Sequence, residues 1–360
     1  MLDPLPSPPS FLASLTAPLA EKLHLSTLPL HIHEILGAFV AYHLIGTLFA
    51  PWISNLLFPK YYVNFDARTK VNWNIRVVSL VQSTFINSLA LYLMYTDEER
   101  KNMDWEGRVY GYTGAGGMLQ GFAAGYFLWD LCVCITNVSV FGPGLLAHAI
   151  AALTVFSFGF RPFVNFYGPT FILYELSTPF LNFHWFFDKV NMTGSRAQLY
   201  NGLLLLFTFF SCRLVWGTIQ SVRVYQDVWA ALQAKPGSFT FNDKNATATL
   251  EASTDPVSEL YRFTENDPTV PIWLACTYLG SNVVLNTLNF YWFGKMIETV
   301  KKRFQPGAAG KNKKKQGKLV SEFAGVDVDG LVKGELDVDE KTRGKQSVEV
   351  NKVEVRRRRG

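Results

Sequence analysis

The sequence predicts an all-α fold: a multi-span integral membrane helical bundle of about seven transmembrane helices, followed by a disordered C-terminal tail. Three observations support it. The 360 residues are 49% apolar and 15% aromatic but only 18% charged. Apolar runs long enough to cross a bilayer recur between residues 35 and 297. The basic charge is concentrated at the C-terminal end of the chain.

The distribution of charge excludes a soluble globule. Residues 301–360 contain 17 of the 34 Lys and Arg residues and 9 of the 29 Asp and Glu residues, a net charge of +8. The first 300 residues have a net charge of −3 and only 37 charged side chains, about half the share usual for soluble domains. A nucleic-acid partner is not expected, because the basic excess lies in a tail and not on a folded face.

Seven apolar segments match the length needed to cross a bilayer. They cover residues 35–58, 73–95, 114–138, 145–160, 163–187, 199–224 and 271–297. The fourth is expected to begin only after a break at Gly142-Pro143-Gly144, and the fifth is interrupted by proline. An odd number of spans places the two termini on opposite sides of the membrane.

Basic residues near the short loops predict the orientation. Lys301, Lys302 and Arg303 begin the tail, which argues for a cytosolic C-terminus and a lumenal N-terminus. The sequon at Asn245 then lies in a lumenal loop.

Three regions follow from this topology. They are a short Pro-rich lumenal N-terminus at 1–32, a transmembrane region at 33–303, and a disordered basic cytosolic tail at 304–360. The basic clusters at 313–315 and 356–359 are expected to attract anionic lipid headgroups, or simply to anchor the topology.

No cofactor and no metal site is predicted. The four cysteines lie inside apolar runs, without the spacing of a disulfide framework or a zinc site. His31 and His33 do not have the spacing of a helical metal pair, and beyond Glu34 no set of carboxylate partners is evident in the sequence.

Three glycines recur every four residues in the third span, at Gly117, Gly121 and Gly125. This spacing lets a neighbouring helix backbone approach closely. We expect it to serve packing within the bundle first and a homodimer contact second.

A few polar groups interrupt the apolar spans, where they are costly. Asp130, His148 and Glu175 are ionisable, and Pro179 follows Glu175 by four residues. Proline cannot donate to the carbonyl of Glu175, so the helix should kink there and leave that carbonyl free. The residues expected to gather at the break are Ser177, Thr178 and Asn182.

Counted from the cytosolic ends of their spans, Asp130, His148 and Glu175 reach depths at which all three could open onto one cytosol-facing cavity. Such a set suits acid–base chemistry or the binding of a polar lipid headgroup. Arg213, deep in the sixth span, needs a partner such as Asp130 or Glu175. Arg76, near the cytosolic start of the second span, is expected to snorkel to the surface, or else to clamp a phosphate or carboxylate.

Several of these segments together resemble the TLC domain family, which includes the ceramide synthases. They are Trp73-Asn-Ile-Arg-Val-Val-Ser79, Gly125-Tyr-Phe-Leu-Trp-Asp130, His148 and Tyr174-Glu-Leu-Ser-Thr-Pro-Phe-Leu-Asn182. The resemblance covers about residues 33–303, with a core at about 71–300. It implies an endoplasmic-reticulum-type membrane protein whose six-helix barrel accepts a lipid. It also adds Tyr126 and Tyr174 to the cavity-lining candidates.

The chain departs from the synthase pattern at three of the five positions of its motif. His148 and Glu175 match the second His of a His-His pair and the first carboxylate 27 residues later, whereas Ala147, Tyr174 and Thr178 replace the other members. We therefore favour a non-enzymatic TLC protein that handles a membrane lipid and affects membrane lipid composition, trafficking or sensing. The alternative is an acyltransferase-type enzyme that acts on a lipid or long-chain base through His148 and Glu175.

Overall fold

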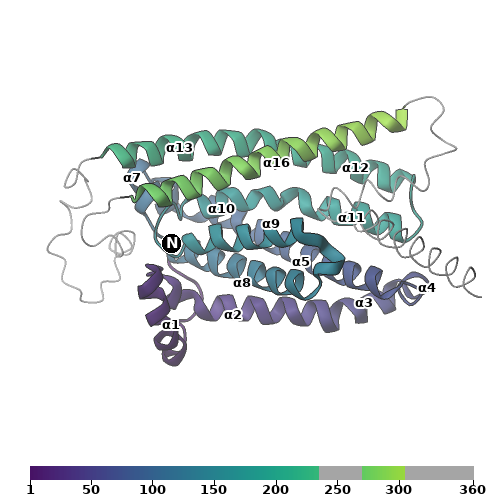
Figure 1. The fold of residues 1–360 in the computed structure, drawn as a ribbon, viewed down its shortest axis with the longest axis horizontal. Helices are drawn as coiled ribbons and strands as arrows, with labels where there is room; N and C mark the ends of the chain where they lie inside the picture. The colour runs from purple at the N-terminus through teal and green to yellow at the C-terminus, as the bar shows by residue number, and fades with distance from the viewer. Residues whose placement is uncertain (235–269, 305–360) are drawn as a thin grey trace, which may run out of the picture.

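The structure is a computed structural model that describes residues 1–234 and 270–304. These residues form helices, and no strand occurs among them. Most helices lie roughly along the long axis of the molecule (Figure 1). The sequon at Asn245 and the basic clusters of the tail lie outside the described residues.

The seven predicted spans all correspond to helical segments. Four spans are single helices: α5 (Ala67–Thr96) is the second, α8 (Gly114–Thr136) the third, α9 (Val138–Phe158) the fourth and α16 (Ile272–Phe304) the seventh. The first span consists of α2 (Leu28–Leu44), a π-helical turn (Ile45–Phe49) and α3 (Ala50–Leu57), and the fifth of α10 (Tyr167–Ile172), a 3₁₀ segment (Leu173–Ser177) and α11 (Thr178–Lys189). The sixth consists of α12 (Arg196–Phe209), a π-helical segment (Phe210–Trp216) and α13 (Gly217–Gln233). The short connecting helices are α4 (Pro59–Tyr62), α6 (Glu98–Lys101) and α7 (Trp105–Tyr110).

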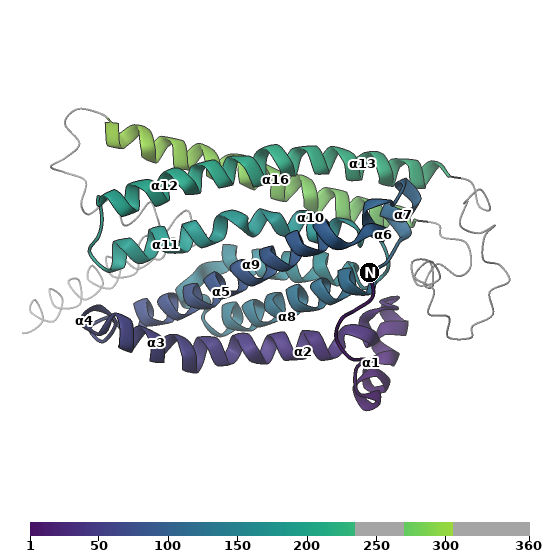
Figure 2. The ribbon, with the colours of Figure 1, turned by 180° about the vertical axis from the view of Figure 1, so that it is seen from behind.

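Four stretches of the described chain are long and apolar enough to cross a membrane. They are Leu28–Leu57, Ala67–Thr96, Trp105–Thr136 and Arg196–Gln233. With the all-helical architecture, they confirm the predicted fold class. The two opposite views agree that α2 and α3 form one side of the bundle, with α12, α13 and α16 on the other (Figures 1 and 2).

Side-chain caps explain where several helices begin. Asp66, Asp97, Asp104, Thr113 and Ser195 each precede a helix and accept a hydrogen bond from a backbone N–H of its first turn. Such bonds satisfy donors that have no partner within the helix. The hydrogen bond with Thr69 also lowers the pKa of Asp66.

The N-terminal region contains a helix that the sequence analysis does not predict, α1 (Ser10–Leu23). Its exposed face presents an apolar stripe at intervals of four residues, which is typical of helices that lie at a membrane surface. The stripe consists of Phe11, Leu15, Leu19 and Leu23. The opposite face packs against the bundle through Ala20. In Figure 1, α1 lies at one end of the molecule, below the start of α2.

The predicted break at Gly142-Pro143-Gly144 is wrong. Helix α9 begins at Val138 and continues through all three residues, and the turn after α8 occurs at Asn137. Proline already has the backbone φ angle of a helix and removes only one hydrogen bond. In lipid, a continuous helix leaves fewer backbone groups without partners than an open loop would.

The glycine stripe packs α8 against α2 within the same chain, as predicted. A Cβ atom on Gly117 would lie 2.2 Å from His31 Nε2, and one on Gly121 would lie 2.5 Å from Glu34 Oε2. A Cβ atom on Gly125 would lie 2.4 Å from the backbone oxygen of Ile35. Only side-chain-free positions allow this separation of the two helices.

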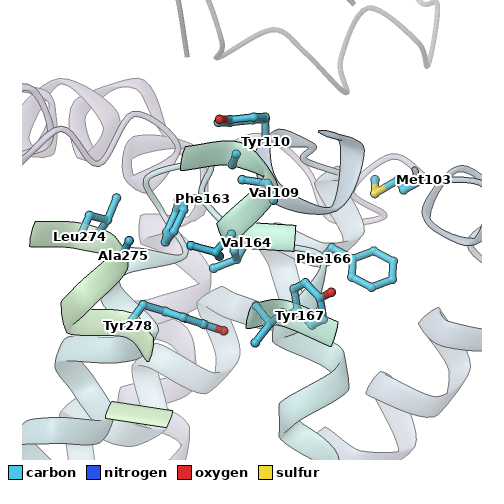
Figure 3. Close-up of a cluster of buried hydrophobic side chains, with 13 residues drawn as sticks. Met103, Val109, Tyr110, Phe163, Val164, Phe166, Tyr167, Leu274, Ala275 and Tyr278 are labelled. Atoms are coloured by element: carbon cyan, nitrogen blue, oxygen red, sulfur yellow. The ribbon is translucent and has the colours of Figure 1, made fainter. Parts of the chain in front are cut away.

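One end of the bundle is held by a buried hydrophobic cluster (Figure 3). It joins the α6–α7 region, the loop before α10, and the first turns of α16. Val109, Val164 and Tyr167 form its centre, and Leu274 and Tyr278 of α16 cover it from one side. Val224, Val228 and Ala231 of α13 belong to the same cluster, which therefore holds the first turns of α16 and the start of α10 against α13.

Candidate functional site

The helix break at residues 173–179 is present, but its hydrogen bonding differs from the prediction. Residues Leu173–Ser177 form a 3₁₀ helix, and Pro179 stands in the first turn of α11. The backbone N–H of Thr178 donates to the carbonyl of Glu175, so the expectation of a free carbonyl there is wrong. The tighter 3₁₀ turn replaces the bond that proline cannot make.

The side chain of Glu175 is held by two hydrogen-bonding partners. The hydroxyl of Thr178 donates to Glu175 Oε2 at 2.6 Å, and Arg213 approaches Glu175 Oε1 at 3.5 Å. Arg213 also donates from Nε to the hydroxyl of Ser177 at 3.0 Å. The sequence analysis predicted Glu175 or Asp130 as the partner of Arg213, and the structure identifies Glu175.

Arg213 comes from the π-helical segment Phe210–Trp216, a distortion that often occurs at functional sites. It also donates to Asn289 Oδ1 of α16 at 3.3 Å, so one guanidinium connects three segments of the bundle. The Arg213 side chain is 14% exposed and that of Glu175 is 31% exposed. The Arg213–Glu175 pair is therefore largely shielded from solvent but is still partly accessible at the surface.

A second set of polar contacts continues along α16. The hydroxyl of Tyr174 donates to Asn286 Oδ1 at 3.1 Å, and Asn286 donates to Ser221 of α13 at 2.8 Å. Three asparagines of this face, Asn282, Asn286 and Asn289, were not among the residues predicted from the sequence. Their spacing of four and three residues on a largely apolar helix was the available signal, because it places them on one face.

Arg76 was expected to snorkel to the surface, or else to clamp a phosphate or carboxylate. The structure places it inside the bundle, so the expectation of snorkelling is wrong. Its side chain is buried, with a residue exposure of 8%. The guanidinium donates to Asn182 Oδ1 at 3.2 Å, and Asn182 donates in turn to Ser79 at 3.0 Å. The ring of Trp185 covers the guanidinium at 4.7 Å. Arg76 therefore joins α5 to α11 through neutral groups.

The charge of Arg76 is not compensated within the described part of the chain. It forms no salt bridge with any described residue, and its buried Nε has no hydrogen-bond acceptor there. Arg100 is also buried, but Asp97 lies close to it and Thr170 accepts its hydrogen bond at 2.7 Å. Burial lowers the pKa of Arg100 to about 10, so this side chain remains charged at neutral pH.

The remaining predicted site residues lie around the same region. Asp130 and Tyr126, both half-buried on α8, are close enough to Glu175 to interact with it electrostatically. The ring of Tyr126 also contacts that of Tyr42 at 5.4 Å. His148 lies on α9, but its side chain is outside the described part of the structure. A single cavity shared by Asp130, His148 and Glu175 stays a prediction.

Comparison with known proteins supports the family resemblance. The model of the TLC domain matches residues 72–298. An uncharacterized TLC domain-containing protein of Schizosaccharomyces pombe is 33% identical over 320 residues, which cover 89% of this chain and 94% of the relative.

Two further relatives agree. Topoisomerase I damage affected protein 4 of Saccharomyces cerevisiae is 30% identical, over 82% of this chain and 95% of its own length. TLC domain-containing protein 4 of Homo sapiens is 28% identical, over 49% of this chain and 66% of its own length. The apolar helical bundle, the extent of the family match and the Schizosaccharomyces pombe relative, matched over 94% of its length, together show that the chain belongs to the TLC domain family.

Proposed function

We propose that this protein binds a membrane lipid by its anionic headgroup at Arg76, between α5 and α11, and thereby affects membrane lipid composition, trafficking or sensing. The observation that supports it most is the buried Arg76 guanidinium, which has no carboxylate partner among the described residues. An uncompensated buried charge costs several kcal/mol, roughly, unless a partner supplies the opposite charge. A lipid phosphate supplies that charge and suits the planar guanidinium.

The surroundings of Arg76 fit the level of lipid headgroups. Tyr62, Trp73 and Trp185 form a buried aromatic cluster beside it. Tyrosine and tryptophan are enriched where a membrane protein crosses from hydrocarbon to headgroups. The ring of Trp185 lies over the guanidinium and joins it to this cluster.

The charge pattern supports a cytosolic location for this end of the bundle. Basic residues gather around it, on α4, at the start of α5, and at the facing ends of α11 and α12. They are Lys60, Arg68, Lys70, Lys189 and Arg196. By the positive-inside tendency, this pattern supports a cytosolic C-terminus and a lumenal N-terminus, which we propose together with a location in the endoplasmic reticulum.

Lipids that co-purify with the full-length chain test the proposal. The chain is purified in a mild detergent as wild type, as Arg76→Gln and as Arg196→Gln, and its bound lipids are quantified by mass spectrometry. Arg196 is the matched control because it is exposed at the same end of the bundle. We expect Arg76→Gln to lose a phosphate-bearing lipid about tenfold or more, the loss of one charged hydrogen-bonded contact, and Arg196→Gln to retain it. Equal retention by both folded variants would refute the proposal.

The alternative, an acyltransferase-type enzyme that uses His148 and Glu175, can be distinguished from lipid binding by experiment. Asp130 and Glu175 lie close together, as two carboxylates of an acid–base site would. However, Glu175 is hydrogen-bonded to Thr178 and paired with Arg213, an arrangement that favours a positioning role over proton transfer.

The discriminating test is lipid analysis of a deletion strain that expresses His148→Ala or Glu175→Gln. Both variants should restore the wild-type lipid profile at normal protein levels. If both are inactive while folded and still bind the lipid, the protein is an enzyme of the acyltransferase type.

A further inference from the structure

A second group of ionisable side chains lies on α2, away from Arg76. Asp3, His31 and Glu34 come together at the N-terminal end of this helix, and one ligand atom from each lies within 4.8 Å of the others. His31 Nδ1 is 2.8 Å from Glu34 Oε2 and 3.5 Å from Asp3 Oδ2. The sequence analysis did not foresee this group, because Asp3 arrives from a separate segment of the chain.

Two members of this group are buried, and the third, Asp3, has a side chain that is 22% exposed. His31 and Glu34 are 1% and 2% exposed. Gly117 and Gly121 of α8 face them, and any side chain at either glycine would overlap His31 Nε2 or Glu34 Oε2. The two glycines therefore do more than bring the helices together: they provide the space that these polar side chains occupy.

Within the described residues, His31 is the closest basic partner of the two carboxyl groups in this group. Asp3 and Glu34 are close enough to share a hydrogen bond, so the buried carboxyl group of Glu34 meets a second, partly exposed carboxyl group. Glu34 Oε1 is buried and has no hydrogen-bond partner. The nearest further donor is His33 Nε2, at 3.9 Å, whose ring nitrogens also have no hydrogen-bond partner in the described structure. Either a shared proton or a cation must offset the repulsion.

We propose that Asp3, His31 and Glu34 bind a divalent first-row transition metal ion, with Zn²⁺ as the probe. One imidazole nitrogen and two carboxylate oxygens form a donor set that suits such ions. Ligand atoms around zinc lie about 3.3 Å apart at bond lengths of about 2.0 Å, close to the 3.5 Å between His31 and Asp3. The metal replaces the shorter hydrogen bond between His31 and Glu34.

The opposite nitrogen of His31 has the partner that a metal ligand needs. Its Nε2 is hydrogen-bonded to the hydroxyl of Tyr112, which holds the ring and leaves Nδ1 for the ion. The site lies where α2 begins, beside α1, whereas α4 and the start of α5, the helix that carries Arg76, lie toward the other end of the bundle (Figure 1).

Metal analysis of the full-length chain with a C-terminal purification tag tests the site. The protein is incubated with Zn²⁺, desalted and analysed for metal by mass spectrometry, beside His31→Gln, Glu34→Gln and the control His43→Gln, an exposed histidine on the same helix. We expect about one zinc ion per wild-type and control chain, and a loss of tenfold or more in both site variants. Tyr112→Phe should weaken zinc binding about tenfold.

Cobalt provides a readout that does not depend on variants that could misfold. Wild-type protein loaded with Co²⁺ should show the visible absorption of a four-coordinate ion, and Zn²⁺ should displace it. A wild-type chain that retains no zinc and shows no cobalt spectrum would overturn the proposal and leave a shared proton as the compensating charge. Equal zinc content in wild type and His31→Gln would also overturn it.

Discussion

Substituting alanine for Gly125 is expected to destabilise the protein by about 3 kcal/mol, because overpacked sites commonly cost 1–3 kcal/mol and this one has little freedom to relax. The new Cβ would lie 2.4 Å from the backbone oxygen of Ile35 and 2.7 Å from the Cβ of Ala38. Neither atom can move by a change of rotamer, so α2 and α8 must separate. Unfolding in a detergent of increasing denaturing strength measures the loss.

Two other glycines serve as controls for Gly125→Ala. A Cβ added to Gly37 of α2 or to Gly280 of α16 meets no atom within 4 Å. Alanine at these helical positions should be neutral or stabilising, by up to about 1 kcal/mol. A Gly125→Ala protein as stable as the Gly37→Ala protein would contradict the close packing of α8 on α2.

Loss of the Asp227 carboxylate should be comparably damaging. Arg108 donates to this carboxylate from Nε at 2.6 Å and from a second nitrogen at 2.7 Å, and the hydroxyl of Tyr167 donates at 2.5 Å. Asp227 is buried and the Arg108 side chain is 14% exposed. Asp227→Ala leaves a shielded guanidinium and a buried hydroxyl without their acceptor, at a cost of about 3 kcal/mol. The same denaturation measurement checks it.

An exposed ion pair provides the comparison for Asp227→Ala. Lys101 and Glu98 lie 2.7 Å apart, but their side chains are 38% and 73% exposed. Glu98→Ala should therefore change stability by less than about 1 kcal/mol. If the two alanine variants lose the same small amount of stability, the Arg108–Asp227 pair does not hold α7 to α13.

The helices were predictable from the sequence because their signal is local. A span needs about twenty apolar residues, and that length shows in the chain itself, as in α5 and α8. The position of Pro179 likewise predicted the break before α11. The start of α9 was not predicted correctly, because Gly142 and Pro143 are common in loops and yet are tolerated in membrane helices.

The site was only partly predictable because its partners come from distant parts of the chain. Thr178 was expected to gather near Glu175 at the helix break and does contact it, and one of the two partners suggested for Arg213 was right. The burial of Arg76 and its bond to Asn182 depend on how α11 lies against α5, which no local pattern reveals. The same is true of Asp3, which meets α2 only after the N-terminal segment folds back.

The central claim is that a lipid phosphate neutralises Arg76, and a high-resolution structure of the full chain in a phospholipid nanodisc tests it most directly. The account predicts headgroup density beside α5 and α11, with phosphate oxygens in hydrogen-bond contact with the Arg76 guanidinium, including its Nε. A structure in which Arg76 is resolved and contacts only Asn182, Trp185 and water, with no lipid at this position, would contradict it.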